Sequence, residues 1–175
     1  MSIFQRARGP RSSRAEKSPL KEKVPDSPSA LKARALRHLA RREHSRDELA
    51  RKLSPHAESP EILEGLLREL ESRKQLSNER FAEGRAHWLG RKYGAAKIRQ
   101  DLASKGISEE LSSRITCAGD ELAKAKAILE RKYRAPATSR EERAERARFL
   151  QSRGFSYDTI RGALGLSSST NFSEE

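Results

Sequence analysis

Basic residues recur in pairs along this chain, each pair placed two residues after a leucine in a helical pattern. The leucines are separated by 50 residues (39 to 89) and then by 40 (89 to 129), and the groups are Leu39 with Arg41-Arg42, Leu89 with Arg91-Lys92, and Leu129 with Arg131-Lys132. Guanidinium and ammonium groups bind phosphates and carboxylates. The spacing therefore predicts recognition of a polyanion by a unit that occurs about three times.

The other reactive side chains form no pattern that predicts catalysis. The four histidines have neither HxxxH nor HExxH spacing, and the single cysteine, Cys117, excludes an internal disulfide and a thiol metal cluster. The sequence also lacks a glycine-rich phosphate loop and a GxSxG motif. We expect no catalytic residue, no metal site and no cofactor, an inert Cys117, and surface positions for His38, His44, His56 and His87.

Composition limits the size of any core and favours an anionic partner. The 175 residues carry 37 Lys and Arg against 25 Asp and Glu, which gives a net charge of +12, and 34% are hydrophobic with only 5% aromatic. Small cores and a DNA, RNA or nucleic-acid-loaded protein partner are expected. Because the longest apolar run is the three residues 127–129, we expect no membrane span and no signal peptide. The lone cysteine fits a cytoplasmic protein.

Two short segments predict where helices end within the repeated unit. They are Lys105-Gly106-Ile107-Ser108 and Arg153-Gly154-Phe155-Ser156. In each, glycine can adopt the left-handed conformation that terminates a helix, the next apolar residue can pack back on that helix, and serine can cap the following one. With the period of 40 to 50 residues, these stops indicate a stacked array of small helical modules.

The predicted fold class is all-α, an elongated series of about three helix-turn-helix-like modules of three short helices each. No alternation of β-branched residues predicts a strand. Few apolar residues occur in the first 29 positions, which therefore cannot offset the entropy of ordering. We predict a disordered basic arm over 1–29, modules over 30–76, 77–119 and 120–165, and a flexible tail over 166–175.

Several local features can be predicted within this scheme. Capping boxes are expected at Ser45 with Glu48 and at Ser139 with Glu142, and leucine spacing predicts a helix over about 60–72. The first helix of the second module is expected to run to about Tyr93 and to end at Gly94. On that helix Phe81, Arg85, Trp88 and Lys92 form one strip, which we interpret as packing against a neighbouring module in preference to a ligand site.

Three segments, in this order and at these spacings, resemble the bacterial RecX family of RecA regulators. They are ALRHLARREHSRDELARKL, FAEGRAHWLGRKYGAAKIRQDLASKGI and RFLQSRGFSYDTIRGAL. The resemblance covers roughly 30–165, outside the arm and the tail. One departure is Asn78-Glu79, where the family usually has an Asp after the Asn or in its place.

The resemblance implies a non-catalytic modulator that lies in the groove of the RecA filament on DNA. Such a protein inhibits filament extension, ATPase activity, strand exchange and co-protease activity, and so regulates DNA repair and the SOS response. We expect a monomer whose own binding to DNA is weak, sequence-indifferent and salt-dependent. The residues predicted to face the filament or its DNA are Arg41, Arg42, Arg46, Lys52, Arg85, Arg91, Lys92, Lys97, Lys105, Arg131, Lys132 and Arg153.

Two other interpretations fit the charge. A direct DNA-binding helix-turn-helix protein would insert a capped helix, such as the one that starts at Ser45, into a major groove. The acidic residues Asp47 and Glu48 stand where a phosphate or base would approach. A small RNA-binding helical protein is the second alternative, and it is disfavoured because the sequence shows few aromatic residues on which bases could stack.

Overall fold

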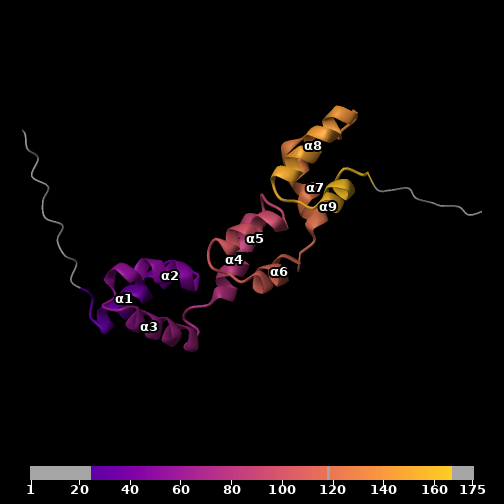
Figure 1. Ribbon diagram of the computed structural model, residues 1–175. Coiled ribbons are helices and arrows are strands. Elements are labelled where there is room, and N and C mark those ends of the chain that lie inside the picture. Colours follow the sequence, from indigo (N-terminus) through magenta and orange to yellow (C-terminus); the bar gives the residue numbers. More distant parts are fainter. Residues whose placement is uncertain (1–24, 118, 167–175) are drawn as a thin grey trace, which may run out of the picture.

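The computed structural model describes residues 25–117 and 119–166 as an elongated series of helices. Within these ranges the chain forms nine α-helices and one short 3₁₀ helix, and no strand. Successive groups of three α-helices follow one another along the molecule (Figure 1). The predicted all-α class is confirmed. Apart from residues 25–29 and Leu166, the predicted arm and tail lie outside the described residues.

The first group comprises α1 (Pro28–Leu39), α2 (Arg46–Leu53), the 3₁₀ helix η1 (Ser54–His56) and α3 (Pro60–Ser72). Serine hydroxyls at 27, 45 and 59 accept a backbone N–H at the start of α1, α2 and α3, which satisfies donors that have no partner inside the helix. The expected bounds of α3 are confirmed. Its leucines pack with α1 and α2 around Leu31, Ala35, Leu49, Leu53, Leu66, Leu67, Leu70 and Leu76.

The second group comprises α4 (Asn78–Gly90), α5 (Ala95–Ala103) and α6 (Glu109–Cys117). The predicted end of α4 is wrong by three residues, because the helix stops at Gly90 and Arg91 caps it. Gly94 has a different role, since it is the N-cap of α5. The core of this group consists of Phe81, Ala82, Leu89, Ile98, Leu102 and Ile107.

The third group comprises α7 (Glu121–Lys132), α8 (Arg140–Ser152) and α9 (Tyr157–Ala163). The predicted capping box at Ser139 and Glu142 is confirmed in both of its hydrogen bonds. On α7, Ile128 is buried, whereas Leu122 is 37% exposed. The core consists of Ala125, Ile128, Leu129, Leu150, Phe155 and Ile160.

The two predicted helix stops have the expected conformation. Gly106 and Gly154 have φ of 77° and 82°, in the left-handed region that glycine adopts at little cost. The apolar residues that follow them, Ile107 and Phe155, are buried. The serines of both stops then accept a backbone N–H three residues on.

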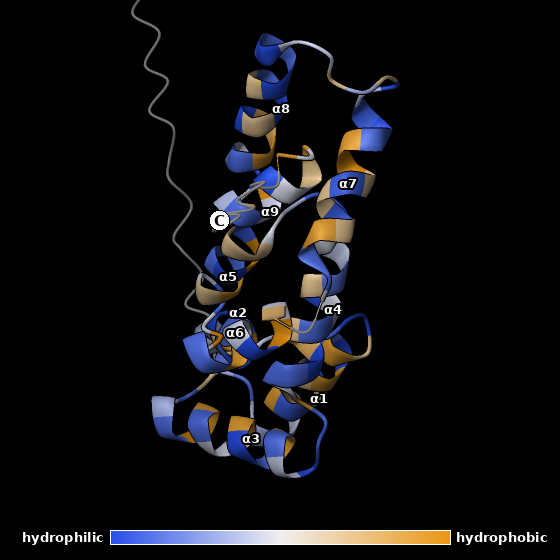
Figure 2. Cartoon of the chain, turned by 90° about the vertical axis from the view of Figure 1, so that its right-hand side faces the viewer, coloured by the Kyte–Doolittle hydropathy of each residue, from blue (hydrophilic) through white to orange (hydrophobic). Residues whose placement is uncertain are grey.

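Each core is small, and hydrophobic residues are interspersed with hydrophilic ones along the helices (Figure 2). His44 contradicts the prediction that the four histidines lie on the surface, because it is 3% exposed. Its Nδ1 donates to the carbonyl oxygen of Arg42 at 2.9 Å, and burial lowers the pKa of its ring. In the described ranges, no helix is long and apolar enough to cross a membrane.

α1 begins at Pro28, before the predicted end of the arm at residue 29, and the residues just before it contact the first group. The Arg34 guanidinium donates to Asp26 at 2.7 Å, and the backbone N–H of Asp26 donates to the carbonyl oxygen of His56 at 2.8 Å. Ser27 caps α1. A boundary after residue 24 therefore leaves all of these contacts within the first group.

Two truncations test how much residues 25–29 contribute to the stability of the fold. Deleting 1–24, which have few apolar residues, should leave the thermal midpoint unchanged. Deleting 1–29 removes the Ser27 cap, which contributes about 1 kcal/mol, together with the Asp26 contacts, and should lower the midpoint by a few degrees. Thermal unfolding followed by circular dichroism measures both, and an equal loss in the shorter deletion would contradict the assignment.

Candidate polyanion-binding surface

The first and second groups meet where the C-terminal turn of α5 lies against the N-terminus of α2. The Ser45 hydroxyl donates to the carbonyl oxygen of Lys105 at 2.7 Å, and the backbone N–H of Arg46 donates to Oδ1 of Asn78 at 2.8 Å. We call this contact the first joint. The predicted capping box at Ser45 forms only in half, because Ser45 accepts the N–H of Glu48 but the Glu48 carboxylate binds Arg42.

The second and third groups meet in the same way, at a contact that we call the second joint. Here the C-terminal turn of α8 lies against the N-terminus of α5. The N–H groups of Gly94 and Ala96 donate to the carbonyl oxygens of Arg153 and Gly154 at 2.9 and 3.2 Å. The N–H of Ala95 donates to Oε1 of Glu121 at 2.6 Å. Two quasi-equivalent joints thus link the three groups.

The joints place the second helix of each group in one row. α2, α5 and α8 follow one another along one edge of the array (Figure 1). In each joint, carbonyl oxygens at the end of one helix meet N–H groups or a capping hydroxyl at the start of the next, so the helix dipoles are aligned favourably. A side chain at the first position of the following group's leading helix, Asn78 or Glu121, completes each joint.

Several of the predicted cations gather at the first joint. A hollow of about 410 Å³ is lined by Arg42, Arg85 and Lys105 together with Arg80 and Trp88. The Arg42 guanidinium makes two hydrogen bonds of 2.9 Å with the Glu48 carboxylate, and this contact lowers the pKa of Glu48. Three of the twelve predicted cations are therefore brought together here, but Arg42 is already paired.

Arg85 is held in a similar pair within the second group. Its guanidinium donates to both carboxylate oxygens of Asp101, at 2.8 and 2.9 Å, and lowers the pKa of that carboxyl. Lys105 makes no ion pair within the described residues, yet its charge also lowers the pKa of Asp101 and of Glu48. Its ammonium group is thus close to both pairs and bound to neither.

A second set of predicted cations gathers at the second joint. The Arg153 guanidinium donates to the carbonyl oxygen of Lys92 at 2.9 Å and lies over the rings of Phe149 and Tyr93, at 4.5 and 5.8 Å from their centroids. The Arg131 guanidinium donates to the carbonyl oxygen of Arg91. Both arginines therefore cross the joint and help to hold it.

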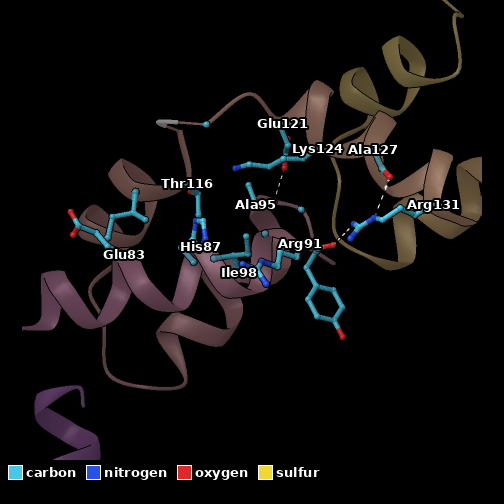
Figure 3. A pocket seen from close by; sticks show the side chains of 16 residues that line it. Glu83, His87, Arg91, Ala95, Ile98, Thr116, Glu121, Lys124, Ala127 and Arg131 are labelled. Carbon is cyan, nitrogen blue, oxygen red and sulfur yellow. Dashed lines mark hydrogen bonds between the residues drawn. The ribbon is translucent and has the colours of Figure 1, made fainter. Parts of the chain in front are cut away.

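A cavity of about 650 Å³ opens beside the second joint, between α4, α5, α6 and α7 (Figure 3). Glu121 reaches across it to the start of α5, and Arg131 reaches from α7 toward Arg91. Lys124 and His87 also line it. Two polar contacts that link the second and third groups, those of Glu121 and Arg131, thus lie among the residues that line this cavity.

The twelve predicted cations divide by their contacts. Within the described residues, five side chains make no hydrogen bond, ion pair or ring contact, and these are Arg41, Lys52, Arg91, Lys97 and Lys105. The guanidinium of Arg46 pairs with Glu64 and Glu71 on α3, and only its backbone N–H takes part in the first joint. Lys132 lies over the Phe149 ring, 3.9 Å from its centroid. The unpartnered five are the ones whose charge is fully available to a partner.

Sequence reasoning missed the residues that build the joints and misplaced one aromatic residue. Asn78 and Glu121 open α4 and α7, and that shared position was the only available signal of their role. Trp88 was expected to pack against a neighbouring module, but it is 55% exposed. Although aromatic residues are few, Trp88 therefore offers an exposed ring on which a base could stack.

The fold and the joints define a class of protein, a tandem array of three-helix modules linked end to end. Residues 77–113 match the family model of the second three-helix domain of RecX, and residues 119–164 match that of the third. The chain is 44% identical over 135 residues to the regulatory protein RecX of Ralstonia nicotianae, which covers 76% of this chain and 85% of that protein. It is 44% identical over 143 residues to the RecX of Herbaspirillum seropedicae, covering 81% and 93%.

Solved structures show the same architecture. The crystal structure of RecX from Lactobacillus salivarius superposes with a TM-score of 0.71 at 19% identity, over 80% of this chain and 97% of the other. A second structure of a regulatory protein RecX gives a TM-score of 0.64 over 79% of this chain and 75% of the other. The chain belongs to the RecX family of regulatory proteins.

Proposed function

We propose that this protein regulates the RecA recombinase by binding in the groove of the RecA filament on DNA and limiting its extension. Membership of the RecX family supports a regulatory role. The observation that carries the mechanism is the repeated joint, because it sets cations at a similar place in successive modules. Inhibition of ATPase activity, strand exchange and co-protease activity would follow from this binding, without a catalytic group.

An array of similar modules is suited to a partner built of identical subunits. A filament presents the same subunit surface many times, and an array that engages several subunits gains affinity from each additional contact. The row of α2, α5 and α8 runs along one edge, and unpartnered cations lie on it or beside it, with Arg91 and Lys97 at the second joint and Lys105 at the first. This arrangement suits a surface of acidic side chains or DNA phosphates.

The joints argue against the helix-turn-helix alternative. In that mode, the N-terminal residues of the second helix contact base edges in the major groove. Here the start of α2 is occupied by the carbonyl oxygen of Lys105 and the side chain of Asn78. The start of α5 is occupied in the same way by Arg153 and Gly154. Two of the three candidate reading helices therefore have N-terminal groups that are hydrogen-bonded to the neighbouring module.

The DNA-dependent ATPase activity of RecA tests the proposal. A modulator that blocks filament growth while subunits continue to dissociate should inhibit well below one copy per RecA, and inhibition should persist at salt concentrations that abolish its binding to bare DNA. A competitor for DNA must instead cover the lattice, and its effect should vanish with its DNA affinity. A titration at two salt concentrations distinguishes them, and inhibition that requires full coverage of the DNA would contradict the proposal.

A further inference from the structure

Trp88 is an exposed aromatic residue between two hollows of the surface. It lies near the end of α4, is 55% exposed, and lines both the hollow at the first joint and a second one of about 450 Å³ formed by α4 and α5. The exposed indole offers a large, flat aromatic face on which a planar group can stack. It is also the only tryptophan in the chain.

The ring is surrounded by positive charge of two kinds. The Arg85 guanidinium lies 5.4 Å from the ring centroid and is fixed by its two hydrogen bonds to Asp101. The Lys92 ammonium lies 5.9 Å from the same centroid. Lys97 lines the second hollow and Lys105 the first. Within the described residues, none of the three lysines makes an ion pair, although the carboxylates of Glu48 and Asp101, which pair with arginines, line the same hollows.

We propose that this site binds an unpaired nucleic-acid strand, with one base stacked on the Trp88 indole and the adjoining phosphates held by Lys92, Lys97 and Lys105. Stacking on an aromatic side chain combined with a basic groove is how single strands are bound without sequence preference. The site is independent of the filament proposal, because it requires the strand alone and no RecA.

The chemistry of the site favours an unpaired strand over other polyanions. An acidic peptide would satisfy the lysines but would leave the indole face without a planar partner, whereas each base of a single strand offers one. A duplex keeps its bases stacked on one another and presents mainly phosphates to such a surface. The preference predicted here is therefore for unpaired over paired nucleic acid, with little dependence on sequence.

The fluorescence of the single tryptophan reports on stacking directly. The full-length protein is titrated with a thymidine homopolymer, with a duplex of equal length, with polyphosphate as a polyanion without bases, and with polyglutamate as an acidic peptide. We expect strong quenching by the single strand alone. Equal quenching by polyphosphate would show that charge suffices, and tighter binding of polyglutamate would assign the site to an acidic protein. Either result overturns the proposal.

Substitutions separate stacking from charge. W88L should weaken binding of the homopolymer about fivefold or more while the affinity for polyphosphate stays unchanged. Y157L is the matched control, because Tyr157 is also an exposed aromatic, 73% exposed beside Arg161, and lies outside the site. Its single-strand affinity should equal that of the wild type, measured by fluorescence anisotropy of a labelled strand. Unchanged binding by W88L would overturn the proposal.

Discussion

Replacing Gly154 with valine should separate the third module from the second. Gly154 has φ of 82°, and a Cβ atom there would lie 2.7 Å from the backbone nitrogen of Lys97. A left-handed residue other than glycine costs roughly 1–2 kcal/mol, and overpacking against a fixed backbone adds about 1–3 kcal/mol. Because the second joint is held by few contacts, we expect this cost to exceed the free energy with which those contacts hold the two modules together.

Amide hydrogen exchange measures this loss locally. The N–H groups of Gly94 and Ala96, which donate across the joint, should lose their protection in G154V, while those in the α1 to α3 core should keep it. Gly65 supplies the control, because it lies inside α3 with no atom within 4 Å of an added Cβ. G65A should be as stable as the wild type or more so, by up to about 1 kcal/mol. Full protection of Gly94 in G154V would contradict the described joint.

Reversing the charge of three unpartnered cations at the joints should remove most of the proposed RecA inhibition. Arg91, Lys97 and Lys105 make no hydrogen bond, ion pair or ring contact within the described residues, so R91E, K97E and K105E together should alter the surface with little effect on folding. Because several weak contacts act together in a multivalent complex, we expect the amount needed for half-inhibition to rise about tenfold or more.

A matched variant controls for net charge. Lys126, Arg134 and Arg148 are exposed and equally unpartnered within the described residues, and K126E, R134E and R148E change the charge by the same amount away from both joints. This variant should inhibit the RecA ATPase almost as the wild type does, and circular dichroism should show both variants folded. Equal loss in the two variants would indicate general electrostatics, and unchanged inhibition in the first would exclude the proposed surface.

The sequence predicted the helices well where local physical chemistry decides them. The left-handed glycines at 106 and 154, the capping box at Ser139 and the bounds of α3 follow from a few neighbouring residues, and the structure confirms them. The end of α4 could not be predicted in this way. Its apolar spacing continues to Tyr93, but Gly94 is required for the second joint, where an added Cβ would lie 2.5 Å from the carbonyl oxygen of Gly154.

The candidate site was predicted only in its composition. Counting charges identifies cations at helix ends, but it cannot show that Arg42 and Arg85 are neutralised by Glu48 and Asp101, or that Arg153 crosses a joint. Those pairings depend on residues 6, 16 and 61 positions apart. His44 was misplaced for the same reason, because its burial depends on how the turn after α1 folds back.

The main-chain hydrogen bonds of the second joint have a consequence for how such proteins diverge. Carbonyl and N–H groups are common to every residue, so the contacts at Gly94, Ala96, Arg153 and Gly154 place few demands on side-chain identity beyond the two glycines. Surface charges can then be exchanged by mutation while the spacing of the modules is inherited unchanged. This is consistent with a TM-score of 0.71 at 19% identity, and it would let related proteins adapt to different partner surfaces without rebuilding the scaffold.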